Sequence, residues 1–126
     1  MAEQLVTVSK VKEVIGGNDM RTDSGLPDSL NETVAGLLDG AIARTQENGR
    51  QTVRPEDLAG RRSDDAASLT VASRIKDHVK GAGLRSDANL PEAVNGRVQS
   101  ILEEAIDRAR ANGRSTVRPY DLPAVR

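Results

Sequence analysis

The sequence contains no cysteine, no tryptophan and no phenylalanine, and its one aromatic residue is Tyr120. Without cysteine it can form neither a disulfide framework nor a thiolate metal site. A core built from aliphatic side chains alone suits helices packed on helices better than stacked sheets. No apolar run reaches the length that a transmembrane helix needs, and no secretory signal pattern is present. These absences favour an all-α protein, which we expect to be cytoplasmic and to have no membrane partner.

The sequence also lacks an excess of either charge. It has 18 basic and 19 acidic residues, a net charge of −1. This balance argues against a uniformly basic surface of the kind that coats nucleic acid. Most of the basic residues are arginines, however, and the planar fork of arginine suits phosphate contacts and short-range ion pairs. The distribution of charge, rather than its sum, must therefore indicate the partner.

One eleven-residue phrase occurs twice, as NGRQTVRPEDL at 48–58 and as NGRSTVRPYDL at 112–122. A phrase repeated at an offset of 64 residues indicates a duplicated domain. Aligned at that offset, the two copies match along nearly their whole length. We predict copy one at 1–59, a polar linker at 60–68, and copy two at 69–126.

Each copy has the pattern of a short helix, a long helix and a very short third helix. The short helices are predicted at 8–15 and 72–79, each stopped by the glycines that follow. The long helices are predicted from Leu26 and Leu90 to the glycines of the repeated phrase, with Asn89 and Glu92 as a capping box. The third helix begins at Pro55 in copy one, where it is expected to reach about Arg62. It begins at Pro119 in copy two, where it is expected to make one turn.

The apolar residues of each long helix form a stripe over about 22 residues, or roughly 33 Å. One copy cannot bury this stripe, because its two short helices leave half of it open. Two long helices that cross would close a common core. The linker keeps the second copy permanently at high effective concentration.

The order of short, long and short helix, with the second-loop pattern Gly-Arg-x-Thr-Val-x-Pro-x-Asp-Leu, resembles a histone fold. The shortened third helix resembles the small bacterial histones, and the duplication resembles a fused histone-fold doublet. The resemblance implies an intramolecular pseudo-dimer that binds the phosphate backbone of double-stranded DNA without sequence specificity. It implies an architectural, nucleoid-associated protein that bends or compacts DNA.

The resemblance also assigns roles to residues of the loops. The loop arginine pairs with the aspartate seven residues later, which gives structural clamps Arg50–Asp57 and Arg114–Asp121. The extended pairs 52–53 and 116–117 would each meet the first loop of the other copy, at 85–86 and 21–22. The predicted DNA-binding residues are Lys10, Lys12, Arg21, Thr22, Arg50, Thr52, Arg54, Arg74, Lys76, Arg85, Ser86, Arg114, Thr116 and Arg118.

Two alternatives stay open at this point. The loop arginines could serve only to brace the fold, above all Arg50 and Arg114, which have clamp aspartates. The whole chain could be a histone-fold module for protein–protein interaction, with weak or no DNA binding, as its acidic pI suggests. Glu56 in copy one stands where copy two has Tyr120, so we expect copy two to offer the better phosphate site.

No arrangement of residues predicts an enzyme. The single histidine, His78, replaces Val14 of copy one, so neither catalysis nor metal binding is expected of it. We predict no cofactor, no metal and no small-molecule substrate. Histones whose dimers stack into tetramers or longer assemblies often carry a histidine near the end of the long helix, where this chain has Glu47 and Ala111. That difference argues against assembly beyond the pseudo-dimer.

Overall fold

A computed structural model describes residues 4–63 and 68–123 of the chain. Helices dominate, as predicted, and the same order of elements occurs in each half of the chain. The elements of the first half are α1 (Val8–Gly17), β1 (Arg21–Thr22), α2 (Leu26–Glu47), β2 (Thr52–Val53) and η1 (Pro55–Asp57). Those of the second half are α3 (Ala72–Gly81), β3 (Arg85–Ser86), α4 (Leu90–Ala111), β4 (Thr116–Val117) and η2 (Pro119–Asp121).

The long helices α2 and α4 begin at the predicted leucines and each contain 22 residues. A proline occupies the first turn of each, where its missing N–H removes no intrahelical bond. Both helices end just before a glycine in the left-handed region, Gly49 at φ 66° and Gly113 at φ 69°. The predicted capping box is wrong: Asn89 has helical backbone angles and its side chain does not cap α4.

The short helices are longer than predicted, because Gly16, Gly17 and Gly81, which were expected to stop them, lie inside the last turn; Gly83 follows α3 as predicted. α1 runs to Gly17 and α3 to Gly81. The chain reverses after α1 at Asp19, which has φ 60°, and after α3 at Gly83, which has φ 80°. Glycine is therefore tolerated at the end of these helices, and the left-handed residue that follows is what ends them.

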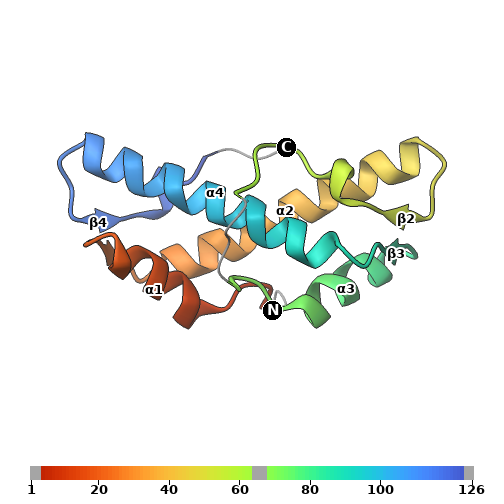
Figure 1. The fold of residues 1–126 in the computed structure, drawn as a ribbon, viewed down its shortest axis with the longest axis horizontal. Coiled ribbons are helices and arrows are strands. Elements are labelled where there is room, and N and C mark those ends of the chain that lie inside the picture. The colour runs from red at the N-terminus through yellow and green to blue at the C-terminus, as the bar shows by residue number, and fades with distance from the viewer. Residues whose placement is uncertain (1–3, 64–67, 124–126) are drawn as a thin grey trace.

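The two long helices cross at the centre of the molecule, and α1 and α3 lie on one side of the crossing (Figure 1). The apolar stripes of both helices meet there. Leu37, Leu38, Ile101 and Leu102 are completely buried in one aliphatic cluster that also takes in the apolar faces of α1 and α3. This burial supplies the main driving force for folding. Neither half could bury its long helix alone.

Backbone hydrogen bonds also join the two halves. β1 pairs in parallel with β4, and β2 pairs in parallel with β3, so each pair takes one strand from each half. Near the N-terminus, Val6 and Thr70 form an isolated antiparallel bridge. The predicted meeting of 52–53 with 85–86, and of 116–117 with 21–22, is confirmed by these registers.

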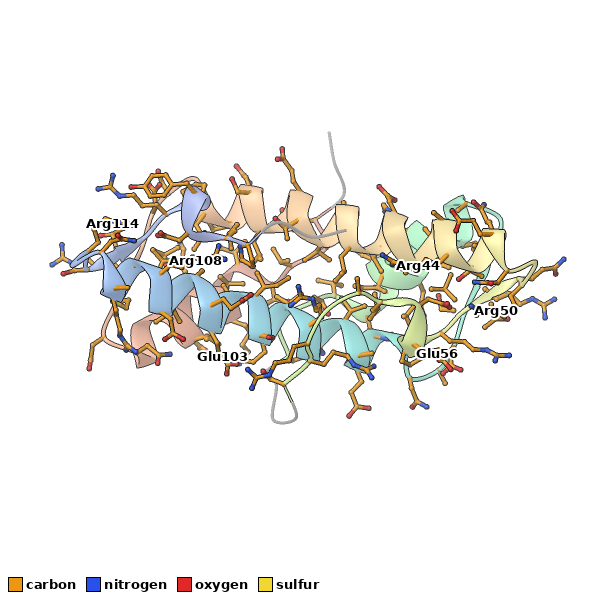
Figure 2. The ribbon with its side chains drawn as sticks, turned by 90° about the horizontal axis from the view of Figure 1, so that it is seen from above. Arg44, Arg50, Glu56, Glu103, Arg108 and Arg114 are labelled. Atoms are coloured by element: carbon orange, nitrogen blue, oxygen red, sulfur yellow. The ribbon has the colours of Figure 1, made fainter. Side chains whose placement is uncertain are left out.

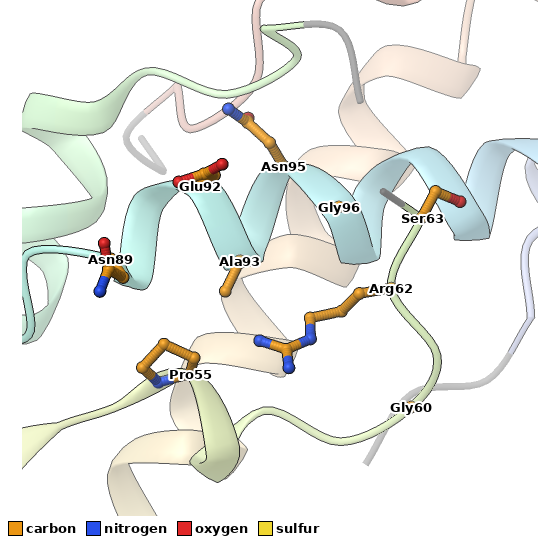
Figure 3. Close-up of a pocket in the computed structure, with 9 residues that line it drawn as sticks. All are labelled: Pro55, Gly60, Arg62, Ser63, Asn89, Glu92, Ala93, Asn95 and Gly96. Atoms are coloured by element: carbon orange, nitrogen blue, oxygen red, sulfur yellow. The ribbon is translucent and has the colours of Figure 1, made fainter. Parts of the chain in front are cut away.

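The third helix of copy one does not reach Arg62. η1 is a single 3₁₀ turn of three residues, and Leu58 after it is extended, with ψ 133°. Residues 58–63 instead cross α4 on the side of the molecule opposite α1 and α3 (Figure 1). Figure 3 shows this segment passing beside Gly96, with the Arg62 side chain directed along α4 towards Ala93 and Pro55. Residues 64–67 of the predicted linker lie outside the described residues.

Candidate nucleic-acid interface

Each pair of strands places loops from both halves of the chain at one end of the molecule. At one end Arg21 is opposite Thr116, and at the other end Arg85 is opposite Thr52. The Arg21 N–H donates to the Ser115 carbonyl at 2.8 Å. The Arg85 N–H makes the equivalent bond to Gln51 O, also at 2.8 Å. The backbone positions of Arg21 and Arg85 are thus fixed by the other half of the chain.

Arg50 is held against the loop of copy one by a buried carboxylate. Its guanidinium donates from Nη1 to Asp57 Oδ2 at 2.9 Å and from Nη2 to Asp57 Oδ1 at 2.5 Å. Asp57 is 4% exposed and also accepts from the Arg54 backbone N–H and from the Thr45 hydroxyl. The pKa of Asp57 is lowered to about 2, chiefly by the Arg50 hydrogen bonds and further by those from Arg54 and Thr45, against the opposing effect of burial.

Copy two has the same arginine–aspartate clamp, but its aspartate has one hydrogen-bond donor fewer. Arg114 donates from Nη1 and Nη2 to the two carboxylate oxygens of Asp121, at 2.8 and 2.6 Å. Asp121 is 2% exposed and also accepts from the Arg118 backbone N–H. The pKa of Asp121 is lowered, chiefly by the Arg114 hydrogen bonds. Ala109 stands where copy one has Thr45, so no hydroxyl joins this network. Arg50 and Arg114 lie at opposite ends of the molecule (Figure 2).

Four other loop arginines are exposed, two at each end: Arg21 with Arg118, and Arg54 with Arg85. Arg54 and Arg118 directly precede the 3₁₀ turns, and only their backbone N–H groups are used by the clamp aspartates. The loop residues Thr22, Thr52, Ser86 and Thr116 are half-buried in the strands. An exposed guanidinium on a fixed backbone, next to a threonine or serine hydroxyl, has donors suited to a phosphate group.

The helices between the two ends are more basic than acidic. α1 contains Lys10 and Lys12 against one glutamate, and Lys10 is 3.4 Å from Glu13. α3 contains Arg74, Lys76 and Lys80 against one aspartate. Arg74 is partly engaged, because its Nη1 donates to Gln4 O at 2.9 Å.

The long helices have the opposite balance. α2 has four acidic residues and one arginine, and α4 has four acidic residues and three arginines. One of those arginines, Arg97, is 7% exposed and therefore adds little to the surface potential. The positive charge of this nearly neutral chain is thus concentrated in α1, α3 and the paired loops. We call these elements together the basic ridge.

Three structurally important polar groups have no role that the sequence pattern predicts. Asn31 accepts a 2.6 Å hydrogen bond from the Leu5 N–H, and Asn95 accepts one of 2.9 Å from the Thr70 N–H. Both fix the segment that leads into a short helix. In the sequence, the one indication of this role is that asparagine occupies the same position in both copies.

The third group, Arg97, binds the linker. Its Nε donates to Ala59 O at 2.8 Å and its Nη1 to Arg61 O at 3.3 Å. Burial lowers the pKa of Arg97. The one sign of this site in the sequence is a break in the repeat, since copy one has Thr33 at the equivalent position.

His78 on α3 faces α2, where its Nε2 lies 2.8 Å from Asp39 Oδ1. Among the described residues, no cluster of three or more histidine, aspartate or glutamate side chains could hold a metal ion. Within those same residues, no helix is both long and apolar enough to span a membrane.

Comparison with known proteins establishes the fold. No protein-family model matches the sequence, and no curated protein matches it. Among solved structures, the crystal structure of the histone from Methanopyrus kandleri matches with a TM-score of 0.61 and 15% sequence identity. The match covers 92% of this chain and 89% of that one, so it extends over both halves of the repeat. At this identity the similarity shows a shared fold.

Proposed function

We propose that this chain is a fused histone doublet, with two histone folds at 1–59 and 69–126 that form an intramolecular pseudo-dimer. In this proposal it binds double-stranded DNA along the basic ridge by contacts to phosphates, without sequence specificity, and bends or compacts it. Its place would be with the nucleoid. The fold it shares with a histone supports this function. The balance of net charge does not oppose it, because acidic residues outnumber basic ones on the long helices, whereas basic residues outnumber acidic ones on α1 and α3.

The observation that carries the proposal is the pairing of loops from different copies. Each end of the molecule presents two exposed arginines on a backbone fixed by a parallel strand pair and by an arginine–aspartate clamp. The basic residues of α1 and α3 lie between these ends. Phosphate contacts separated in this way would hold one duplex at several points along its backbone.

The test is a fluorescence-anisotropy titration with a blunt duplex at about 50 mM salt, followed by a salt series. We compare the wild type with the double variants Arg21→Ala/Arg85→Ala and Arg54→Ala/Arg118→Ala. Each arginine that contacts a phosphate should contribute about 0.9 to the slope of log K against log salt. Each double variant should therefore bind more weakly and lower the slope by up to about 1.8.

Arg61→Ala/Arg62→Ala is the matched control. It removes the same charge from the exposed linker, on the side away from the basic ridge, and should keep both affinity and slope. If all three double variants lost the same affinity for the duplex, the loss would follow from net charge alone, and binding along the basic ridge would be contradicted. Absence of duplex binding at low salt would instead favour a module for protein–protein interaction, for which the exposed acidic residues of α4, Glu103, Glu104 and Asp107, offer a surface.

A further inference from the structure

The only aromatic side chain of the chain lies at the surface. Tyr120 is the second residue of η2 and is 66% exposed. Among the described residues it is the one large hydrophobic side chain that is exposed. An exposed ring does not contribute to the core, so packing in the core does not explain it. The equivalent residue of copy one, Glu56, is exposed and carries a negative charge. The ring is therefore present at one end of the molecule only.

The ring is held in place by the two arginines of its own loop. The guanidinium carbon of Arg114 lies 4.9 Å from the ring centroid, over one face. Arg114 is itself fixed by its two hydrogen bonds to the buried Asp121. At the edge of the ring, Arg118 Nη1 lies 3.4 Å from the Tyr120 hydroxyl. Arg114 covers one face of the ring. Because two thirds of the side chain is exposed, the second face is open to solvent.

The ring also adjoins the loops that we propose to hold phosphates. β4, which ends three residues before Tyr120, pairs with the strand that contains Arg21. Pro119, directly before the ring, lies against Gly25 at the start of α2, where a Cβ would be 3.6 Å from Pro119 Cγ. A flat aromatic face next to arginines along a phosphate path is the arrangement that stacks unpaired nucleobases.

We propose that Tyr120 is a stacking site for an unpaired nucleobase, and that the copy-two end of the molecule therefore binds duplex DNA next to a single-stranded overhang. This inference rests on the proposed DNA binding and names a preferred form of DNA. Bases inside a duplex are stacked on each other and cannot offer a face to the ring. A blunt duplex would use only the phosphate contacts, whereas an overhang would add the stacked base.

The experiment uses the full chain and two labelled duplexes, one blunt and one with a four-nucleotide thymidine overhang. Stacking of one base should make binding to the overhang roughly fivefold to hundredfold tighter. Because the chain contains no tryptophan and one tyrosine, its ultraviolet emission reports on Tyr120 directly. The overhang should quench this emission more than the blunt duplex, after correction against free N-acetyltyrosinamide with the same DNA.

Four variants separate stacking from charge and from folding. Tyr120→Trp should keep the preference for the overhang, whereas Tyr120→Leu should lose it and still bind blunt duplex like the wild type. Tyr120→Glu reproduces copy one and should lose the preference as well. Glu56→Tyr installs a ring at the other end and should raise the affinity for the overhang duplex further, because the unpaired base can then stack at either end.

The outcomes distinguish this inference from the proposed function. Equal affinity of the wild type for both duplexes, or an unchanged preference in Tyr120→Leu, overturns the stacking site and leaves duplex binding intact. Failure of the wild type to bind the blunt duplex overturns the proposed duplex-binding function. If the overhang still binds in that case, and Tyr120→Leu abolishes that binding, the stacking site stands without it.

Discussion

Replacing Arg97 with alanine should release the linker from α4. The Arg97 side chain is buried and donates to the carbonyl of Ala59, directly before the linker, and to that of Arg61 within it. A hydrogen bond from a charged donor contributes about 1.5–3 kcal/mol, but the cost of burying the guanidinium offsets part of this. We therefore expect Arg97→Ala to destabilise the docked linker by about 2 kcal/mol.

Two glycines show how closely the linker fits. Gly60 has φ 94°, and a Cβ there would lie 2.4 Å from the Arg97 guanidinium. A Cβ on Gly96 would lie 2.9 Å from the Ser63 carbonyl oxygen, and the Ser63 N–H donates to Gly96 O at 2.9 Å. Within the described residues, the hydrogen bonds that would still join this segment to α4 without the Arg97 side chain are those of Ser63, to Gly96 O and to Glu103.

Limited trypsin digestion measures the release directly, because Arg61 and Arg62 in the linker are cleavage sites. Cleavage needs the segment to leave α4, so its rate follows the open population when opening is fast. A loss of about 2 kcal/mol should make cleavage at these sites about thirtyfold faster. The control is Thr33→Ala at the equivalent position of copy one, whose hydroxyl bonds only within α2, to Ser29 O. Equal cleavage rates in Arg97→Ala and the wild type would refute the reasoning.

Three further predictions concern the clamp, the N-terminal segment and the two ends of the basic ridge. Asp57→Asn should remove roughly 2 kcal/mol of stability at pH 7, since the pKa of Asp57 is lowered from 3.8 to about 2. Because that pKa is depressed in the folded state, its contribution is present above about pH 4 and is lost as the pH falls towards 2. Urea unfolding at pH 7 and pH 3 should therefore show a larger difference between wild type and variant at pH 7. Asn31→Ala should cost about 1–3 kcal/mol of stability, because it leaves the buried Leu5 N–H without its acceptor. Asn31→Asp keeps an acceptor and should cost less, which thermal unfolding of the two variants tests. Arg118→Ala should weaken duplex binding more than Arg54→Ala in the same anisotropy assay, because Glu56 lies beside Arg54; equal losses would contradict this asymmetry.

The order of the elements could be predicted because the repeat provides two independent examples of it. A helical stripe with proline at its start and glycine after its end occurs in both copies, so both ends of each long helix follow from local rules. The pairing of Thr116 with Arg21 could not be obtained from such rules, since the residues are far apart in sequence. It came from the resemblance to histones, and the strand register confirms it.

What could not be predicted depends on contacts between distant segments. The third helix of copy one was expected to continue to Arg62, because proline begins a helix and the residues that follow permit one. It ends after one turn, where the Asp57 carboxylate binds Arg50 and the Arg54 N–H, and where Ala59 O is bound by Arg97. Local helical propensity is weaker than these tertiary hydrogen bonds. The sequence alone does not show that they form.

The structure also explains why copy two departs from copy one where it does. In a dimer of separate identical chains, every substitution occurs at two symmetric positions. In a single chain that contains both copies, the segment 58–63 crosses α4 and not α2, so an arginine that binds it is needed at only one of the two equivalent positions. Thr33 is half-buried and keeps its hydroxyl bonded within α2. The same freedom allows Tyr120 to stand opposite Glu56 across the pseudo-symmetry. The two ends of the basic ridge are therefore chemically different, and any DNA bound along it would meet a ring at one end and a carboxylate at the other.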